Sequence, residues 1–230
     1  MTPHSPYENT WLGVFEEMRN CTSIRMSRDH QGPLSLPIGD APKAFADLAE
    51  WENIQLEPSL QRCYLRFSNL AACWGTDDSE SDPLIAGEFD ITHIYKALTR
   101  DAPDPGWADP SVEERQMLPE LRAFDGTTMT GAGHLTMLRI QRGVGNPQVW
   151  FNKAPFGPHL MDIDYCGYLE ALRITKGTFG WQFLFTEVSL ADSGHEATTE
   201  RLTNMLDVFP GLFPDHDYEP LRARLADRLR

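Results

Sequence analysis

The stretch YCGYLEALRITKGTFGWQFLF, residues 165–185, decides the predicted fold because it joins a helical pattern to an aromatic run through two glycines. Apolar residues recur in its first half at the helical spacing: Tyr165, Tyr168, Leu169 and Leu172. Asp164 stands where an N-cap belongs, and Lys176 followed by Gly177 predicts the helix end, since glycine tolerates the left-handed conformation there. The aromatic run 179–185 is short and predicts a buried strand.

The first third of the chain has helical patterns. Ser5 begins a capping-box motif, so a helix over about 6–20 is predicted. The stretch 27–42 is rich in proline and glycine and predicts a connector. Asp40 can cap a second helix, and Glu57 with the proline after it can open a third. We therefore expect the N-terminal third to be helical.

Strand patterns lie further along the chain. The segment 83–90 predicts a short strand, after which Asp90 can cap a helix. The segments 135–141 and 148–152 predict two strands joined by a tight turn, because a glycine-rich stretch separates them. The sheet is therefore expected in the C-terminal half.

Two further amphipathic segments, 197–209 and 221–230, predict helices at the end of the chain, with a break between them. The fold class that follows is α+β, with a mainly antiparallel sheet flanked by helices. We expect an N-terminal helical extension and connector over 1–39, an α+β domain over 40–190, and a C-terminal helical extension over 191–230. Together these parts are expected to form one compact domain.

Acidic residues dominate the charge: 34 acidic against 20 basic residues give a net charge of −14. Between Asp77 and Asp125 there are 13 carboxylates and 4 lysines or arginines. Such a surface repels nucleic acid and anionic membranes and attracts a basic protein. A solvated acidic face without a partner is the alternative interpretation.

The four cysteines, Cys21, Cys63, Cys73 and Cys166, form no C-x-x-C pair. This scatter predicts neither a zinc site nor a disulfide framework, and free thiols in the cytoplasm are the expectation. The N-terminal residues have no signal-peptide pattern, and no apolar run is long enough to span a bilayer.

Motifs for a cofactor, a metal ion or a nucleophile are not found in the sequence. The glycine pairs near Gly131 and Gly143 precede strands, whereas a dinucleotide-binding loop leads into a helix. The histidines do not have metal-ligand spacing, and no G-x-S-x-G elbow occurs. The residues therefore predict a binding protein without cofactor or metal, rather than an enzyme.

The opening stretch, together with VWFN at 149–152, resembles the terminal signature of the SUKH superfamily of immunity proteins, which is related to a yeast cell-wall-synthesis regulator. The upstream segment LEPSLQRCYLRFSN is similar to a helix of that family, although Asn69-Leu70 stands where Asn-Gly is expected. The positions of the resemblance expected to be structural are Tyr168, Leu169, Leu172, Gly177, Gly180, Trp181 and Phe185.

The resemblance implies a mainly antiparallel sheet with flanking helices and a bacterial cytoplasmic protein that binds and neutralises a cognate toxin. Two polar, proline-marked loops and the residues after them are the expected toxin contacts, since recognition residues are often displayed on loops. These contacts are Asp77, Asp78, Glu80, Asp82, Asp101, Asp104, Trp107, Asp109, Glu113 and Glu114. They would cover a basic active site with an acidic surface.

Two other functions stay open at this point. A carboxylate-based hydrolase could use members of the acidic segment 77–125, because paired carboxylates can act as general acid and base. A regulatory scaffold could bind a host protein and no toxin. The sequence identifies neither the toxin, nor its chemistry, nor the stoichiometry of a complex.

Overall fold

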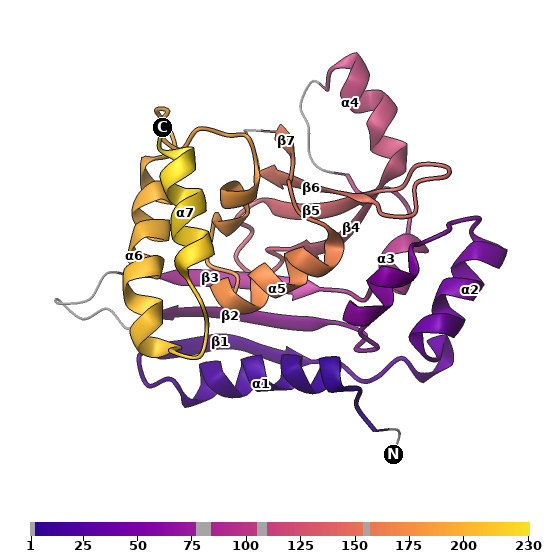
Figure 1. The fold of residues 1–230 in the computed structure, drawn as a ribbon, viewed down its shortest axis with the longest axis horizontal. Helices are drawn as coiled ribbons and strands as arrows, with labels where there is room; N and C mark the ends of the chain where they lie inside the picture. The colour runs from indigo at the N-terminus through magenta and orange to yellow at the C-terminus, as the bar shows by residue number, and fades with distance from the viewer. Residues whose placement is uncertain (1–2, 77–83, 105–109, 154–156) are drawn as a thin grey trace.

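The computed structural model describes residues 3–76, 84–104, 110–153 and 157–230 (Figure 1). The protein has the α+β fold that the sequence predicts, but its antiparallel strands form two sheets where one sheet was expected. The first sheet has the order β1-β2-β3 and the second β4-β5-β6-β7. The strands are β1 Ile24–Gln31, β2 Leu70–Thr76, β3 Ala86–Ile91, β4 Leu121–Gly126, β5 His134–Arg139, β6 Gln148–Lys153 and β7 Gly157–Leu160.

Helices precede, separate and follow the strands. The α-helices are α1 Pro6–Asn20, α2 Ala41–Trp51, α3 Ile94–Leu98, α4 Val112–Met117, α5 Tyr165–Thr175, α6 Glu196–Leu212 and α7 Glu219–Arg228. Short 3-10 helices are η1 Leu36–Ile38, η2 Pro58–Cys63, η3 Leu118–Glu120 and η4 Trp181–Phe185.

The two sheets are joined where β3 meets β4. The amide of Thr92 donates to the carbonyl oxygen of Phe124 at 2.8 Å. The amide of Asp90 donates to the side-chain Oδ1 of Asp125 at 2.9 Å, so this carboxylate takes the place of a backbone acceptor. The register of β4 shifts between Ala123 and Asp125, which is the irregularity that directs the Asp125 side chain towards β3.

Helices α1 and α6 lie beside the first sheet (Figure 1), and aromatic rings of both helices contact it. Trp11 of α1 meets Phe89 with ring centroids 6.0 Å apart. Phe209 of α6 meets Trp74 at 5.9 Å. Phe89 and Trp74 lie on the same face of the first sheet, because Trp74 pairs with Gly87, two residues before Phe89. Helices α1 and α6 therefore cover one face of this sheet.

The helix predicted in the opening stretch is α5, and its expected features are confirmed. The Asp164 side chain accepts from the amide of Gly167, and Lys176 ends the helix with φ 51°. The four residues of the predicted apolar stripe are all buried. Ring contacts of Phe124 with Tyr165 and Tyr168, at 5.2 and 4.9 Å, pack α5 against β4.

Lys176 connects three distant parts of the chain. Its Nζ atom lies 2.6 Å from Oε2 of Glu17 in α1 and 3.1 Å from Nε2 of His216 before α7. Burial lowers the pKa of Lys176, with partial compensation from the Glu17 carboxylate. The hydrogen bond from His216 is the largest cause that lowers the pKa of Glu17, to about 2. Lys176, at the end of α5, thus links α1 to the segment before α7.

The predicted strand over 179–185 is wrong, because this segment forms η4. Gly180 precedes it with φ 89°, and the amide of Phe183 donates to the carbonyl oxygen of Gly180 at 3.1 Å. All residues from Trp181 to Phe185 are buried. A strand with two covered faces and a turn buried on all sides have the same unbroken apolar pattern, so the sequence does not separate them.

The prediction of a helical N-terminal third is also wrong in part, as is the restriction of the sheet to the C-terminal half. The capped helices α1 and α2 are confirmed, but β1 occupies the start of the predicted connector, and β2 follows η2. The helix expected after Glu57 is only the 3-10 helix η2. β1 is an edge strand with charged residues and β2 contains small residues, so neither has a typical strand composition.

Two helix boundaries differ from their predictions. The helix expected after Asp90 is α3, which begins later, and its N-cap is His93, whose side chain accepts from the amide of Lys96 at 3.1 Å. Asp90 lies within β3 instead. Helix α6 continues through Pro210 to Leu212, beyond the break expected there.

The expectation of free thiols is wrong for two of the four cysteines. Cys63 of η2 and Cys166 of α5 form a disulfide across 103 residues of sequence, whereas Cys21 and Cys73 are free. A pairing between cysteines so far apart has no spacing signal in the sequence. Beside it, Arg62 and Asp164 form an ion pair at 3.2 Å.

One hydrophobic cluster contains buried residues from α1, both sheets, α5, α6 and α7. The terminal helices therefore share their core with the central segment. A second, small cluster consists of Met117, Leu121 and Met137. In the part of the chain that is described, no helix is both long enough and apolar enough to cross a membrane.

Candidate functional site

The acidic residues predicted to contact a toxin are placed only in part. Asp77, Asp78, Glu80, Asp82, Trp107 and Asp109 lie outside the described residues. Asp101 and Asp104 are exposed in the segment that follows α3, and Glu113 and Glu114 lie in α4. Glu113 and Glu114 lie beside a groove.

Helix α4 stands out from the body of the molecule (Figure 1). Its first turn is fixed by a capping box, in which the Ser111 amide donates to Oε2 of Glu114 at 2.6 Å and the Glu114 amide donates to the Ser111 hydroxyl at 3.1 Å. Met117 is the buried residue of the helix. Glu114 therefore holds its own helix, and Glu113 is the exposed carboxylate that can meet a partner.

A groove of about 520 Å³ lies between α4 and the second sheet. Met117 and the half-buried Trp150 and Pro158 give it apolar walls, and Glu113 lies at its rim. Arg139 also lines the groove, but its Nε atom donates to Glu120 at 2.7 Å, which neutralises its charge. A groove with both apolar and polar walls and a carboxylate at its rim suits a partner with an apolar and a basic side chain.

Exposed apolar side chains extend this surface. Val112, at the start of α4, is 57% exposed. Leu160 of β7 is 44% exposed and pairs with Trp150 across the sheet. We name the surface formed by Val112, Glu113, Gln116, Trp150, Pro158 and Leu160 the α4 surface.

Other carboxylates of the acidic segment do not belong to an acidic surface. Glu88 is 3% exposed and accepts hydrogen bonds from the amides of Met129 and Thr130. Asp125 is 5% exposed. Asp90 forms an ion pair with Arg28 at 3.1 Å. These groups hold loops and strands together, so the sequence count overstates the charge available to a partner.

Asp90 and Asp125 line a common cavity of about 420 Å³ with Lys96 and Arg100. This pair is the arrangement that a carboxylate-based hydrolase would require. However, Oδ2 of Asp125 accepts from the Tyr168 hydroxyl at 2.6 Å, and its Oδ1 accepts from two backbone amides. Asp90 likewise accepts from Asn69, Thr128 and Arg28. A fully bonded network of this kind favours a structural role.

We expect the free energy of unfolding of the wild type to fall relative to that of Asp125→Asn as the pH rises. Burial is the main cause that raises the pKa of Asp125 from 3.8 to about 7, against the hydrogen bonds from Tyr168 and the amides. The stabilisation that neutral Asp125 gives to the folded wild type is fully present below about pH 4. It is lost as the pH rises through about 7, and the total loss in the free energy of unfolding is at most about 4 kcal/mol. Urea unfolding of both proteins at pH 4 and pH 8 measures it.

Asp101→Asn, which replaces an exposed carboxylate in the same acidic segment, is the control. A stability difference between Asp125→Asn and wild type that does not change with pH would contradict the raised pKa.

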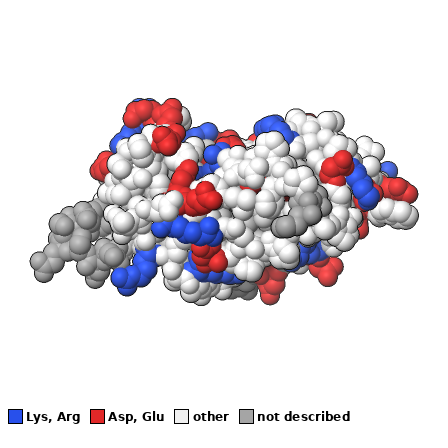
Figure 2. Space-filling view, turned by 90° about the horizontal axis from the view of Figure 1, so that it is seen from below, with Lys and Arg blue, Asp and Glu red and all other residues white. Residues whose placement is uncertain are grey.

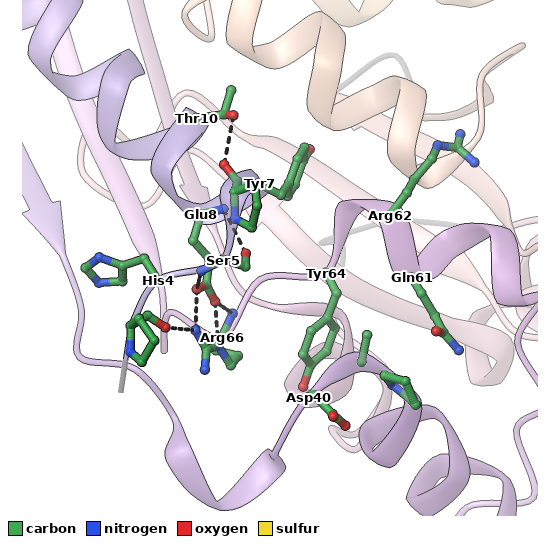
Figure 3. Close-up of a pocket in the computed structure, with 14 residues that line it drawn as sticks. His4, Ser5, Tyr7, Glu8, Thr10, Asp40, Gln61, Arg62, Tyr64 and Arg66 are labelled. Carbon is green, nitrogen blue, oxygen red and sulfur yellow. Dashed lines mark hydrogen bonds and ion pairs between the residues drawn. The ribbon is translucent and has the colours of Figure 1, made fainter. Parts of the chain in front are cut away.

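A second cavity, of about 800 Å³, lies where the N-terminal residues meet α2 and the segment around Arg66 (Figure 3). We name it the N-terminal cavity. It is lined by Pro3, His4, Ser5, Pro6, Tyr7, Glu8, Thr10, Asp40, Ala41, Pro42, Gln61, Arg62, Tyr64 and Arg66. No local sequence pattern indicates this cavity, because its lining residues come from three separate segments.

A buried ion pair holds one side of the N-terminal cavity. Arg66 donates from Nε to Oε1 of Glu8 at 2.8 Å and from Nη2 to Oε2 at 2.6 Å. Glu8 also accepts from the amide of Ser5 at 2.7 Å, as part of the capping box of α1. Burial alone would raise the pKa of Glu8, but the hydrogen bonds from Arg66 and Ser5 lower it below the ordinary value. Glu8 is therefore a charged, fixed group.

Charges of both signs alternate over the face seen from below in Figure 2. This distribution does not form the single acidic field expected from the net charge. Within the described residues, no group of three His, Cys, Asp or Glu side chains is arranged to hold a metal ion. Comparisons of the chain with protein-family models, curated proteins and solved structures found no match.

Proposed function

We propose that this protein is a toxin-neutralising binding protein of the immunity type, acting in the bacterial cytoplasm on a toxin with a basic surface. The observation that carries the proposal is the α4 surface, where an exposed carboxylate and exposed apolar side chains border a groove with a tryptophan in its wall. The resemblance of residues 149–185 to the SUKH superfamily supports the kind of partner. The protein itself would perform no catalysis, because covering the toxin's active site is sufficient.

The charge balance supports a basic protein partner. Most lysines and arginines of the described residues form ion pairs with carboxylates of the same chain, for example Arg19 with Asp29 and Arg224 with Asp162. The exposed carboxylates without a basic partner, which are fewer than the net charge of −14 suggests, are therefore the groups that can attract a basic surface. The same carboxylates repel nucleic acid and anionic membranes, so we propose neither as a partner.

The function is tested with the toxin domain that this proposal expects to be encoded beside this gene; a gene neighbourhood without one would contradict the proposal. The domain is expressed in a bacterial host with this chain, without it, or with the Trp181→Ala variant as a folding-deficient control. We expect growth arrest by the toxin alone and recovery with the wild-type chain. Continued arrest despite abundant, folded wild-type chain would contradict the proposal, and binding of a protein that is not toxic would favour the regulatory scaffold.

We expect Glu113→Lys to slow association with that toxin domain by about threefold to tenfold at low salt. The physical reason is that a reversed charge at the rim of an interface removes electrostatic steering. The effect should shrink as salt rises, because exposed charges are screened. Stopped-flow or surface-based kinetics at two salt concentrations measure the rates.

Glu200→Lys is the matched control, since Glu200 is exposed on α6, at the other end of the molecule from α4 (Figure 1). Equal rates for Glu113→Lys and Glu200→Lys at low salt would exclude Glu113 from the contact surface.

A further inference from the structure

The walls of the N-terminal cavity combine prolines and aromatic rings. Pro3, Pro6 and Pro42 line it together with the rings of Tyr7 and Tyr64 (Figure 3). Its volume of about 800 Å³ lies within the range of pockets that hold small molecules or short peptide segments. The cavity and the groove of the α4 surface share no lining residue.

Hydrogen-bond donors in this cavity outnumber the partners that the chain provides. Tyr64 is 7% exposed, and its buried hydroxyl has no hydrogen-bond partner among the described residues. Burial raises the pKa of Tyr64 far above its ordinary value, so the hydroxyl keeps its proton. Arg66 uses Nε and Nη2 for Glu8 and Pro3, and no described group accepts from its Nη1. The side-chain amide of Gln61, which also lines the cavity, likewise has no hydrogen-bond partner among the described residues.

One carboxylate at the rim remains able to accept. Asp40 is exposed, and only its Oδ1 is used, by the amide of Lys43 at 3.0 Å. Figure 3 shows the Tyr64 hydroxyl directed towards Asp40. The other charges beside the cavity are balanced, since Glu8 pairs with Arg66 and Arg62 pairs with Asp164. The cavity therefore has apolar walls, unused donors and one negative charge.

We propose that the N-terminal cavity binds a proline-rich extended peptide segment with a basic residue beside the prolines. Proline has no backbone N–H, so a polyproline II segment presents carbonyl acceptors and apolar rings. The unused donors of Tyr64, Gln61 and Arg66 match those carbonyls, and the tyrosine rings match the prolines. Recognition of such segments by aromatic-lined grooves is a general mode, with low entropic cost because the ligand is already extended. Asp40 accounts for the basic residue.

The test uses three synthetic peptides and the full chain. The probes are acetylated heptaproline amides with arginine or with glutamate at the N-terminal side, and a Gly-Ser peptide of the same length. Binding is followed by chemical-shift changes in two-dimensional NMR spectra. We expect binding of both heptaprolines and not of the Gly-Ser peptide, with the arginine probe about two- to fivefold tighter, the range of an exposed ion pair.

Two variants locate the site. Asp40→Asn keeps a residue suited to the N-cap and should abolish the preference for the arginine probe. Tyr64→Phe removes only the hydroxyl and should weaken both heptaproline probes by about two- to tenfold, the worth of one hydrogen bond, without a lower melting temperature. Tyr218→Phe is the control, since that hydroxyl donates to Phe213 away from the cavity.

The inference is wrong if heptaproline binds no better than the Gly-Ser peptide. It is also wrong if Tyr64→Phe binds like the wild type, or if the shifts fall on residues outside the N-terminal cavity. A preference for the glutamate probe would overturn the assigned role of Asp40 and, with it, the proposed ligand class. None of these results bears on toxin neutralisation, because the probes contain no toxin.

Discussion

Truncating Trp181 to alanine is expected to lower the free energy of unfolding by about 3–5 kcal/mol, the cost of removing a large buried aromatic side chain. Trp181 is fully buried, and its ring lies 4.8 Å from that of Tyr168 and 5.7 Å from that of Phe185, centroid to centroid. The variant would leave a cavity between α5 and η4, inside the hydrophobic core. Urea unfolding followed by circular dichroism measures the loss.

Trp51→Ala is the matched control for this prediction, because Trp51 is 72% exposed and should cost little. A Trp181→Ala protein with unchanged stability but without toxin binding would show that Trp181 is a contact residue and not part of the core.

Removing the Cys63–Cys166 disulfide is expected to lower the free energy of unfolding by about 2–5 kcal/mol. The bond closes 103 residues of chain, and its absence enlarges the conformational freedom of the unfolded state. The double variant Cys63→Ala/Cys166→Ala is compared with the wild type by urea unfolding under oxidising conditions. Cys21→Ala is the control, because Cys21 is a free and only partly buried cysteine.

The disulfide also bears on the proposed location. Thiols in the cytoplasm are normally kept reduced, so this bond is an observation against the cytoplasmic part of our proposal. Alkylation of the denatured protein without reductant, followed by mass spectrometry, should label Cys21 and Cys73 only. Labelling of all four cysteines in protein taken from the native cytoplasm would show that this disulfide is reduced in that compartment.

The elements that the sequence predicts well have local signals. The capping box at Ser5 and the N-caps at Asp40 and Asp164 mark helix starts, because a short polar side chain can satisfy free amides at a helix N-terminus. Strands β5 and β6 are predicted for a similar reason, since a glycine-rich turn separates two apolar runs. Such signals need no knowledge of the tertiary structure.

The elements that were missed depend on tertiary contacts. β1 consists largely of polar residues, and it is a strand because it pairs with β2 from Ile24 to Gln31. η4 is buried on all sides, so its pattern does not distinguish a turn from a strand. The Cys63–Cys166 pair and the Asp125 network join residues far apart in sequence, and neither has a local pattern.

The sequence predicted that acidic side chains form the candidate site, but it did not predict how they are arranged. Charge pattern singled out Glu113 and Glu114, and the structure places both beside a groove. It also shows that Glu114 caps its own helix, which the serine three residues before it could have indicated. Trp150 was predicted as a strand residue, but its position on the outer face with Leu160 follows from strand pairing.

The most direct test of the central claim, that a basic toxin binds the α4 surface, is amide hydrogen exchange of this chain with and without the toxin domain. We predict slower exchange in α4 and in strands β6 and β7, with unchanged exchange in α6. A bound toxin at this surface would suppress the local opening through which these helix and strand amides exchange, so protection should appear there first. Protection confined to α6, α7 or the N-terminal cavity, with α4 unchanged, would contradict the account.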